Sequence, residues 1–326
     1  MRLLHDKGLL QDARRLHEEM IVVNGLDASS FNLRLVENMK EGGVDVNLVG
    51  LGSGRRELVE QHPELMVHGT TVTSIEEGVA AGKSVIVFGS QGPGRLEGDV
   101  GLVGDLHRLG LRSCGLSYNV ANSVGSGCVE PDPGGLSHLG VELVERLNEW
   151  GICVDVAGHC SEATAFDAIE VGQGPVVCTH TNVKAIRDTP RGTTDEMFRA
   201  IADTGGVAGI TAFRFFVTDG DQATIDDYVD HIEHVARLVG PEHVGLGFDF
   251  IYMRDSLRGA VRSPITFPPA AYPPEYEDWT YVDNLDNHSG APLVTATLIA
   301  RGWKSDDIAK VMGLNWLRVW KEVWGS

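Results

Sequence analysis

The chain of 326 residues has no apolar run long enough to cross a lipid bilayer. Its first twenty residues, MRLLHDKGLLQDARRLHEEM, predict an amphipathic helix. They lack the uninterrupted apolar stretch and the small-residue cleavage site of a secretory signal peptide. We therefore expect a cytosolic protein with no membrane partner.

Positive charge is also scarce in this chain. There are 27 lysines and arginines against 46 aspartates and glutamates, which gives a formal net charge of −19. A surface of that sign repels phosphate backbones, so we expect no nucleic-acid partner.

The sequence lacks several signatures of metal, redox and nucleophilic sites. Its five cysteines are odd in number and form no CxxC pair, which argues against a disulfide framework and a structural zinc site. There is no GxSxG elbow, no HExxH, no phosphate-binding loop and no GxGxxG after a strand. Catalysis by a Ser/His/Asp triad therefore has no support in this sequence.

What the chain does have is a series of short apolar segments separated by helical patterns. Such continuous apolar runs are typical of parallel strands covered by helices on the outside. Eight of them predict an α/β fold, a (β/α)8 barrel of the TIM type. The predicted strands are Met20–Asn24, Val44–Gly50, Ser84–Gly89, Leu111–Ser117, Ile152–Gly158, Pro175–Thr179, Gly206–Phe213 and Val244–Phe248.

We expect one domain over residues 1–326, with an N-terminal helix at 1–19 and closing helices at 291–326. Residues 252–290 form a segment rich in proline and aromatic residues. Long ordered loops of this kind are usually lids or contact surfaces. A lid over the site and an arm packed on a neighbouring subunit are both open interpretations.

Two histidines follow neighbouring predicted strands. His159 ends CVDVAG and His180 ends PVVCT. Active sites of this fold lie at the C-terminal ends of the strands, and adjacent strands lie about 4.8 Å apart. The pair therefore predicts a site for a transition metal, because neutral imidazoles are common metal ligands. The alternative is that both residues are hydrogen-bonded to loops.

Further polar residues lie at other strand ends. Asp249 follows VGLGF and could bind a metal or take a proton from water. Arg191 could hold a substrate carboxylate in a bidentate fashion, or could be a surface residue before a helix. His231 and His234 are expected on an exposed helix face.

The segments around these residues resemble the membrane (renal) dipeptidase family of metal-dependent hydrolases, an amidohydrolase type of barrel. The resemblance rests on DVAGHCSEATAFDAIEVGQGPVVCTHTNVKAIRDTPRGTTDE, VGLGFDF and GLNWLRVW. It implies two zinc ions bridged by a glutamate and the cleavage of dipeptides and related amides. It further implies that His159 and His180 bind one zinc, that Arg191 holds the substrate carboxylate and that Asp249 is the catalytic aspartate.

The chain departs from the family pattern at five positions, one of which is Ile251, where the family's catalytic segment has a second acidic residue. Leu26 and Ala28 stand where a His-x-Asp pair would bind the second zinc, and Gln91 stands where the bridging glutamate would be. Tyr118 replaces a histidine that contacts substrate. These changes resemble a divergent branch of the family. Because Gln91 offers only a neutral carbonyl oxygen, we predict one metal ion rather than two.

The leading hypothesis is a hydrolase of dipeptide-like or other small carboxylate-bearing substrates. One zinc would be bound by His159 and His180 with support from Gln91 or Asp249; iron or no metal are the alternatives. Asp249 and Tyr118 would be catalytic, and Arg191, Tyr118 and Gln91 would contact the substrate. A lyase or isomerase acting on a small carboxylate and a non-catalytic homologue are the other hypotheses. The resemblance also implies a homodimer.

Overall fold

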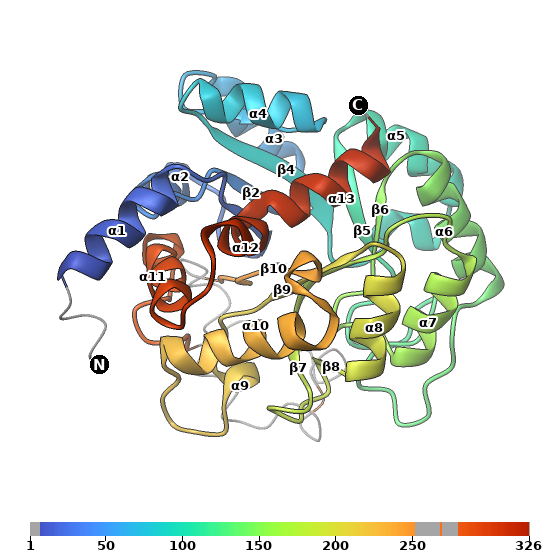
Figure 1. Ribbon diagram of the computed structural model, residues 1–326. Helices are drawn as coiled ribbons and strands as arrows, with labels where there is room; N and C mark the ends of the chain where they lie inside the picture. Colours follow the sequence, from blue (N-terminus) through green and yellow to red (C-terminus); the bar gives the residue numbers. More distant parts are fainter. Residues whose placement is uncertain (1–6, 252–267, 269–279, 326) are drawn as a thin grey trace.

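The structure is a computed structural model, and it describes residues 7–251, 268 and 280–325. Eight parallel strands form a closed barrel in the order β2-β1-β10-β9-β7-β6-β5-β4, and β4 pairs back to β2 (Figure 1). The predicted (β/α)8 barrel is therefore confirmed. The strands are β1 Val23–Asp27, β2 Val46–Gly50, β4 Ser84–Ser90, β5 Leu111–Gly115, β6 Cys153–Asp155, β7 Val177–Val183, β9 Val207–Ile210 and β10 Val244–Leu246.

Two further short strands lie beside the barrel. The strand β3, Met66–His68, pairs with the first residues of β4, whereas β5 pairs with the last ones. The strand β8, Gly192–Thr193, pairs with the end of β7. Neither was predicted, because two or three residues are too few to show a strand pattern.

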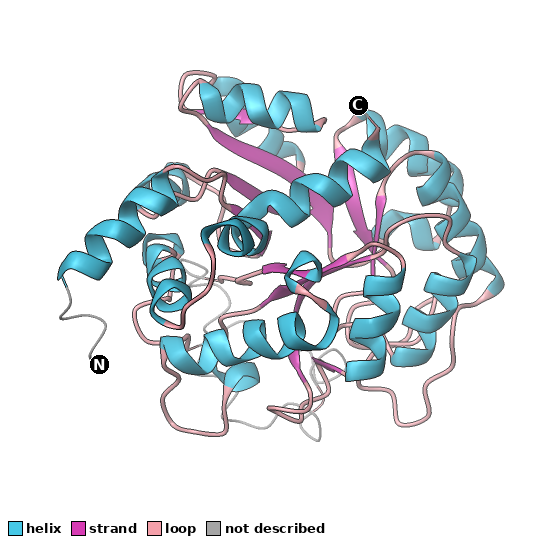
Figure 2. Cartoon of the chain, viewed as in Figure 1, coloured by secondary structure: helices cyan, strands magenta, loops and turns pink. Residues whose placement is uncertain are grey.

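Helices surround the barrel on the outside (Figure 2). The longer ones are α1 Lys7–Glu18, α2 Leu33–Glu41, α3 Ser53–Gln61, α4 Val72–Ala80, α5 Val103–Arg108, α6 His138–Glu149, α7 Glu162–Val171, α8 Asp195–Asp203, α10 Ile225–Val239, α11 Pro292–Ala300 and α13 Asn315–Trp324. Shorter ones are α9 Arg214–Val217, α12 Ser305–Ala309, the π-helix η7 Lys310–Leu314 and the 3-10 helices η2 Gly94–Glu97, η3 Val100–Leu102, η4 Pro241–His243 and η6 His288–Gly290. Within these described residues, no helix is both long and apolar enough to cross a membrane.

The helix α13 packs against the barrel through tryptophans. Trp316 and Trp320 are fully buried, and the Trp316 Nε1 donates a hydrogen bond to the Leu246 carbonyl at 3.1 Å. A Cβ added at Gly25 would lie 2.4 Å from the Trp316 ring, so a glycine is needed there. The closing helices place Leu317 and Val319 in the core, whereas Leu314 is 46% exposed.

Strand boundaries differ from the prediction where polar residues end a strand. The strand β1 runs to Asp27 and β7 runs to Val183, so Asp27 and His180 lie inside strands rather than after them. The apolar pattern of β7 ends too early because His180, Thr181 and Asn182 are polar but buried, and the last residue of β1, Asp27, is also polar and buried.

Two other expectations concern α10 and the proline-rich segment. His231 is fully buried, since its Nδ1 accepts a hydrogen bond from the Val183 backbone and its Nε2 donates to the Val217 carbonyl. The expectation of an exposed His231 was therefore wrong.

The lid-or-arm segment, residues 252–290, falls mostly outside the described residues. Its last part runs beside the end of β9, where Phe213 and Tyr281 form a bridge.

Candidate active site

The centre of the site is a contact between two imidazoles and an amide. The Nε2 atoms of His159 and His180 are 3.0 Å apart, and the Gln91 Oε1 is 3.0 Å from the His159 Nε2. His159 follows β6, His180 lies in β7 and Gln91 follows β4, so three strand ends meet here. The structure thus brings together three of the predicted residues at the C-terminal end of the barrel.

His180 is supported by a buried chain of hydrogen bonds. Its Nδ1 lies 2.9 Å from the Thr179 Oγ1, and this hydroxyl donates to the Asp155 Oδ2 at 2.6 Å. The Asp155 Oδ1 accepts hydrogen bonds from the backbone nitrogens of Thr179 and Ala157, both at 2.9 Å. Burial raises the pKa of Asp155 to about 6 against the opposing effect of these hydrogen bonds, so the carboxyl group is mainly ionised at pH 7.

His159 is held by residues that follow β5. Its Nδ1 lies 2.7 Å from the Asn119 Oδ1, and its ring stacks on that of Tyr118 with the centroids 4.1 Å apart. Asn119 has φ of 64°, a left-handed conformation that asparagine tolerates better than most residues. The turn after β5 therefore positions His159 from two sides.

Both histidines are buried beside a positive charge. Burial first, and then the positive charge of Arg191, lower the pKa of each imidazole well below its usual value. Both rings are therefore neutral at pH 7, which is the state that binds metals. Arg191 itself is 3% exposed and its guanidinium lies 5.3 Å from the centroid of the Phe216 ring.

Asp249 lies after β10 in a strained turn. It has φ of 56°, which is uncommon for a residue other than glycine, and its side chain is buried. The Tyr281 hydroxyl accepts a hydrogen bond from the Ile251 backbone at 2.8 Å and donates one to the Asp249 carbonyl at 3.1 Å. Tyr281 thus holds the turn that carries Asp249.

The end of β1 at the C-terminal face of the barrel has fewer polar side chains than the ends of β4, β6 and β7. Leu26 and Ala28 are buried and carry no side-chain donor atom, so they offer nothing to a metal ion. Between them Asp27 pairs with His288, with the Asp27 Oδ2 and the His288 Nε2 3.1 Å apart. Among the residues that the structure describes, no cluster of three or more His, Cys, Asp and Glu side chains could hold a metal. At the other side of the rim, the histidine pair and Gln91 bring two imidazole nitrogens and one amide oxygen together.

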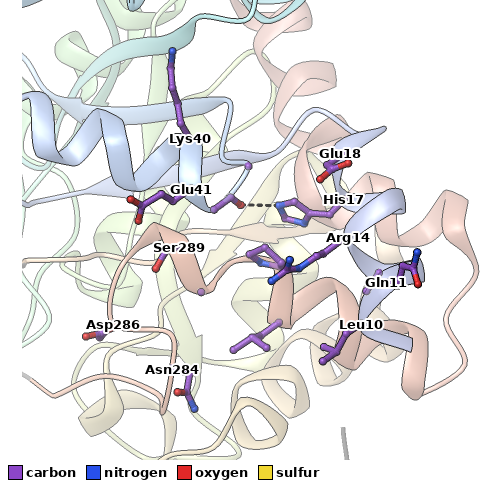
Figure 3. Close-up of a pocket in the computed structure, with 16 residues that line it drawn as sticks. Leu10, Gln11, Arg14, His17, Glu18, Lys40, Glu41, Asn284, Asp286 and Ser289 are labelled. Atoms are coloured by element: carbon purple, nitrogen blue, oxygen red, sulfur yellow. Dashed lines mark hydrogen bonds between the residues drawn. The ribbon is translucent and has the colours of Figure 1, made fainter. Parts of the chain in front are cut away.

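Two cavities can be compared with the position of the histidine pair. A cavity of about 190 Å³ is lined by the sequence neighbours of His159 and Arg191 rather than by these residues themselves: Gly158, Cys160, Pro190 and Gly192. A cavity of about 860 Å³ lies instead between α1, the end of α2 and the residues before α11 (Figure 3). Its charged lining residues have mixed sign and give no indication of a ligand: Arg14, Glu18, Lys40, Glu41 and Asp286.

The closed (β/α)8 barrel has the fold of metal-dependent hydrolases of the amidohydrolase type. The family model of membrane dipeptidase, peptidase family M19, matches residues 36–259 and 276–324. The chain belongs to this family, and the resemblance inferred from the sequence is confirmed.

Three similar proteins show how the chain relates to others. An amidohydrolase structure from Pseudomonas aeruginosa has 30% identity and a TM-score of 0.88, with 96% of this chain and 99% of that chain covered. A Klebsiella pneumoniae protein from the pqqA 5′ region is 32% identical over 72% of this chain and 80% of its own length. Dipeptidase verJ of Clonostachys rogersoniana is 28% identical over 82% of this chain, which spans 62% of that protein.

The sequence did not point to Asn119, Asp155, Thr179 or Tyr281. A signal was present for two of them, since Asp155 is an acidic residue inside the apolar run CVDV and Thr179 directly precedes His180. The other two gave no signal, because their hydrogen-bond partners are far away in the sequence.

Proposed function

We propose that the chain is a hydrolase of dipeptide-like substrates that uses one zinc ion bound by His159, His180 and Gln91. The observation that carries this proposal is the 3.0 Å separation of the two histidine Nε2 atoms. Two nitrogen ligands about 2.0–2.1 Å from one tetrahedral zinc would lie about 3.3 Å apart, so the pair is close to the geometry that an ion requires.

The donor set fits one ion better than two. The three proposed ligands are neutral, and an ion held by them keeps its full positive charge for chemistry. A second ion would need donors near β1, where Leu26 and Ala28 have none. The number of ions and the identity of the metal are therefore part of the proposal.

When bound, zinc would lower the pKa of a water molecule and polarise the amide carbonyl. Substrate binding and proton transfer would be carried out by side chains of this chain. Arg191 would bind the substrate carboxylate through two parallel hydrogen bonds from the N–H groups of its guanidinium. Asp249 would accept a proton from the attacking water and return it to the leaving amine. The Tyr118 ring, stacked on His159, would form one wall of the substrate site and place its hydroxyl near the substrate.

Metal content and activity test this proposal together. We expect the protein, purified with zinc present, to contain about one zinc by mass spectrometry and to hydrolyse members of a dipeptide panel. The variant His180→Ala should lose both properties. His138→Ala, at an exposed position on α6, is the matched control and should keep both. Only trace metal and no amide hydrolysis in the unaltered protein would refute the proposal.

The proposal also includes a homodimer and a cytosolic location, which stay predictions. Light scattering coupled to gel filtration measures the first, and cell fractionation measures the second. A monomeric mass at micromolar concentration would remove the dimer from the proposal.

A further inference from the structure

The strand β7 changes register where His180 lies. Cys178 pairs with Ala208 of β9, but the next paired residue is Thr181, which pairs with Ile210. Two residues of β7, Thr179 and His180, therefore stand opposite one residue of β9. An irregularity of this kind redirects side chains and is common next to active sites.

The register shift places the side chains of Thr179 and His180 close together, although successive side chains of a regular strand point to opposite faces. The carboxylate of Asp155 stabilises this irregular backbone, because its Oδ1 accepts the Thr179 N–H at 2.9 Å. Asp155 is 2% exposed and Thr179 is 1% exposed, so no bulk water competes for these bonds.

The direction of each hydrogen bond follows from what the groups can donate. The Asp155 Oδ1 accepts two backbone N–H groups, which stabilise the ionised carboxylate, and its Oδ2 accepts the Thr179 hydroxyl proton. The Thr179 oxygen is then the acceptor toward His180, whose Nδ1 must carry the proton. Consequently the His180 Nε2 carries a lone pair.

The same reasoning applies to His159. An asparagine Oδ1 can only accept, so the His159 Nδ1 must donate to Asn119 and its Nε2 also carries a lone pair. Two lone pairs 3.0 Å apart repel each other, and the Gln91 oxygen is a third acceptor at the same place. This convergence favours a cation.

We propose that Asp155 and Thr179 are positioning residues that fix His180 in its Nδ1–H tautomer and thereby direct a lone pair, rather than an N–H, into the site. The inference deepens the proposed function and rests on it for the metal. Supporting groups of this kind typically change metal affinity 10- to 100-fold when removed.

The test compares Thr179→Val, which has the same shape without the hydroxyl, with Thr179→Ser, which keeps the hydroxyl. The first measurement is the long-range proton–nitrogen NMR spectrum of histidine-labelled, zinc-free full-length protein. We expect the Nδ1–H pattern for His180 in the unaltered protein and in Thr179→Ser, and its loss in Thr179→Val. His231 is an internal reference of opposite tautomer, since its Nε2 donates to the Val217 carbonyl.

The second measurement is the zinc dissociation constant by competition with a chromophoric chelator. We expect Thr179→Val to bind zinc at least about tenfold more weakly than Thr179→Ser. A His180 Nε2–H pattern in the unaltered protein, or equal zinc affinity of the two variants when the unaltered protein binds zinc, would overturn the inference.

The two measurements separate this inference from the proposed function. If the zinc-free protein shows the expected tautomer but binds no zinc, the hydrolase proposal fails while the positioning role stands. If zinc binds but His180 has the other tautomer, the positioning role fails alone. An unchanged His231 signal in both variants shows that the fold is intact.

Discussion

The carboxyl group of Asp45 gives a stability prediction that can be worked out from the structure. Asp45 precedes β2 and lies partly buried at the opposite end of the barrel from the histidines. Burial raises the pKa of this carboxyl group from 3.8 to about 6, although its Oδ2 accepts the Val22 N–H at 2.8 Å. The ionised form is therefore disfavoured in the folded state.

The sign and the size of the effect of Asp45 on the free energy of unfolding follow from proton linkage. Because the folded pKa is the higher one, the group stabilises the fold while it is protonated, and this contribution is lost as the pH rises from about 4 through 6. Each pKa unit corresponds to about 1.4 kcal/mol, so the carboxylate costs about 3 kcal/mol at pH 8 and about half of that at pH 5.

Asp45→Asn removes the charge and keeps an oxygen that can accept from Val22. We expect the free energy of unfolding of this variant, measured in urea, to exceed that of the unaltered protein. The excess should grow by about 1 kcal/mol or more between pH 5 and pH 8. Asp132→Asn, at an exposed bend, is the control for charge removal at the surface. An excess that is independent of pH, or that shrinks as the pH rises, would refute the reasoning.

Three further predictions concern the site and the barrel. Tyr281→Phe removes both bonds of the hydroxyl to the Asp249 turn, so we expect kcat for dipeptide hydrolysis to fall at least about tenfold at unchanged zinc content; an unchanged kcat would contradict a role in positioning Asp249. Gln91→Glu supplies an anionic oxygen beside His159 and should tighten zinc binding in a chelator titration, whereas weaker binding would argue against Gln91 as a ligand. Gly247→Ala would put a Cβ 2.1 Å from the Thr179 carbonyl oxygen, so we expect it to lower the free energy of unfolding by several kcal/mol in thermal unfolding. Its control is Gly54→Ala on α3, where nothing lies within 4 Å of the added Cβ. We expect this control to change the free energy of unfolding by less than about 1 kcal/mol. Similar stability of these two glycine variants would contradict the packing argument.

The sequence by itself determined the barrel and the place of its site. Buried parallel strands require continuous apolar runs, and this fold brings their C-terminal ends to one face. His159 and His180 could therefore be assigned to one site from their positions after two such runs. The loss of donors at Leu26 and Ala28 was also visible, because it depends only on residue type.

Only the tertiary structure decided which atoms meet in that site. Asn119 lies 40 residues from His159 and Asp155 lies 24 residues from Thr179, so neither hydrogen bond leaves a local pattern in the sequence. The register shift of β7 depends on its pairing with β9. The contacts within the barrel place the His180 Nδ1 at Thr179 and its Nε2 at His159. Strand pairing and register arise from long-range packing, and for that reason the sequence located the histidines but not their orientation.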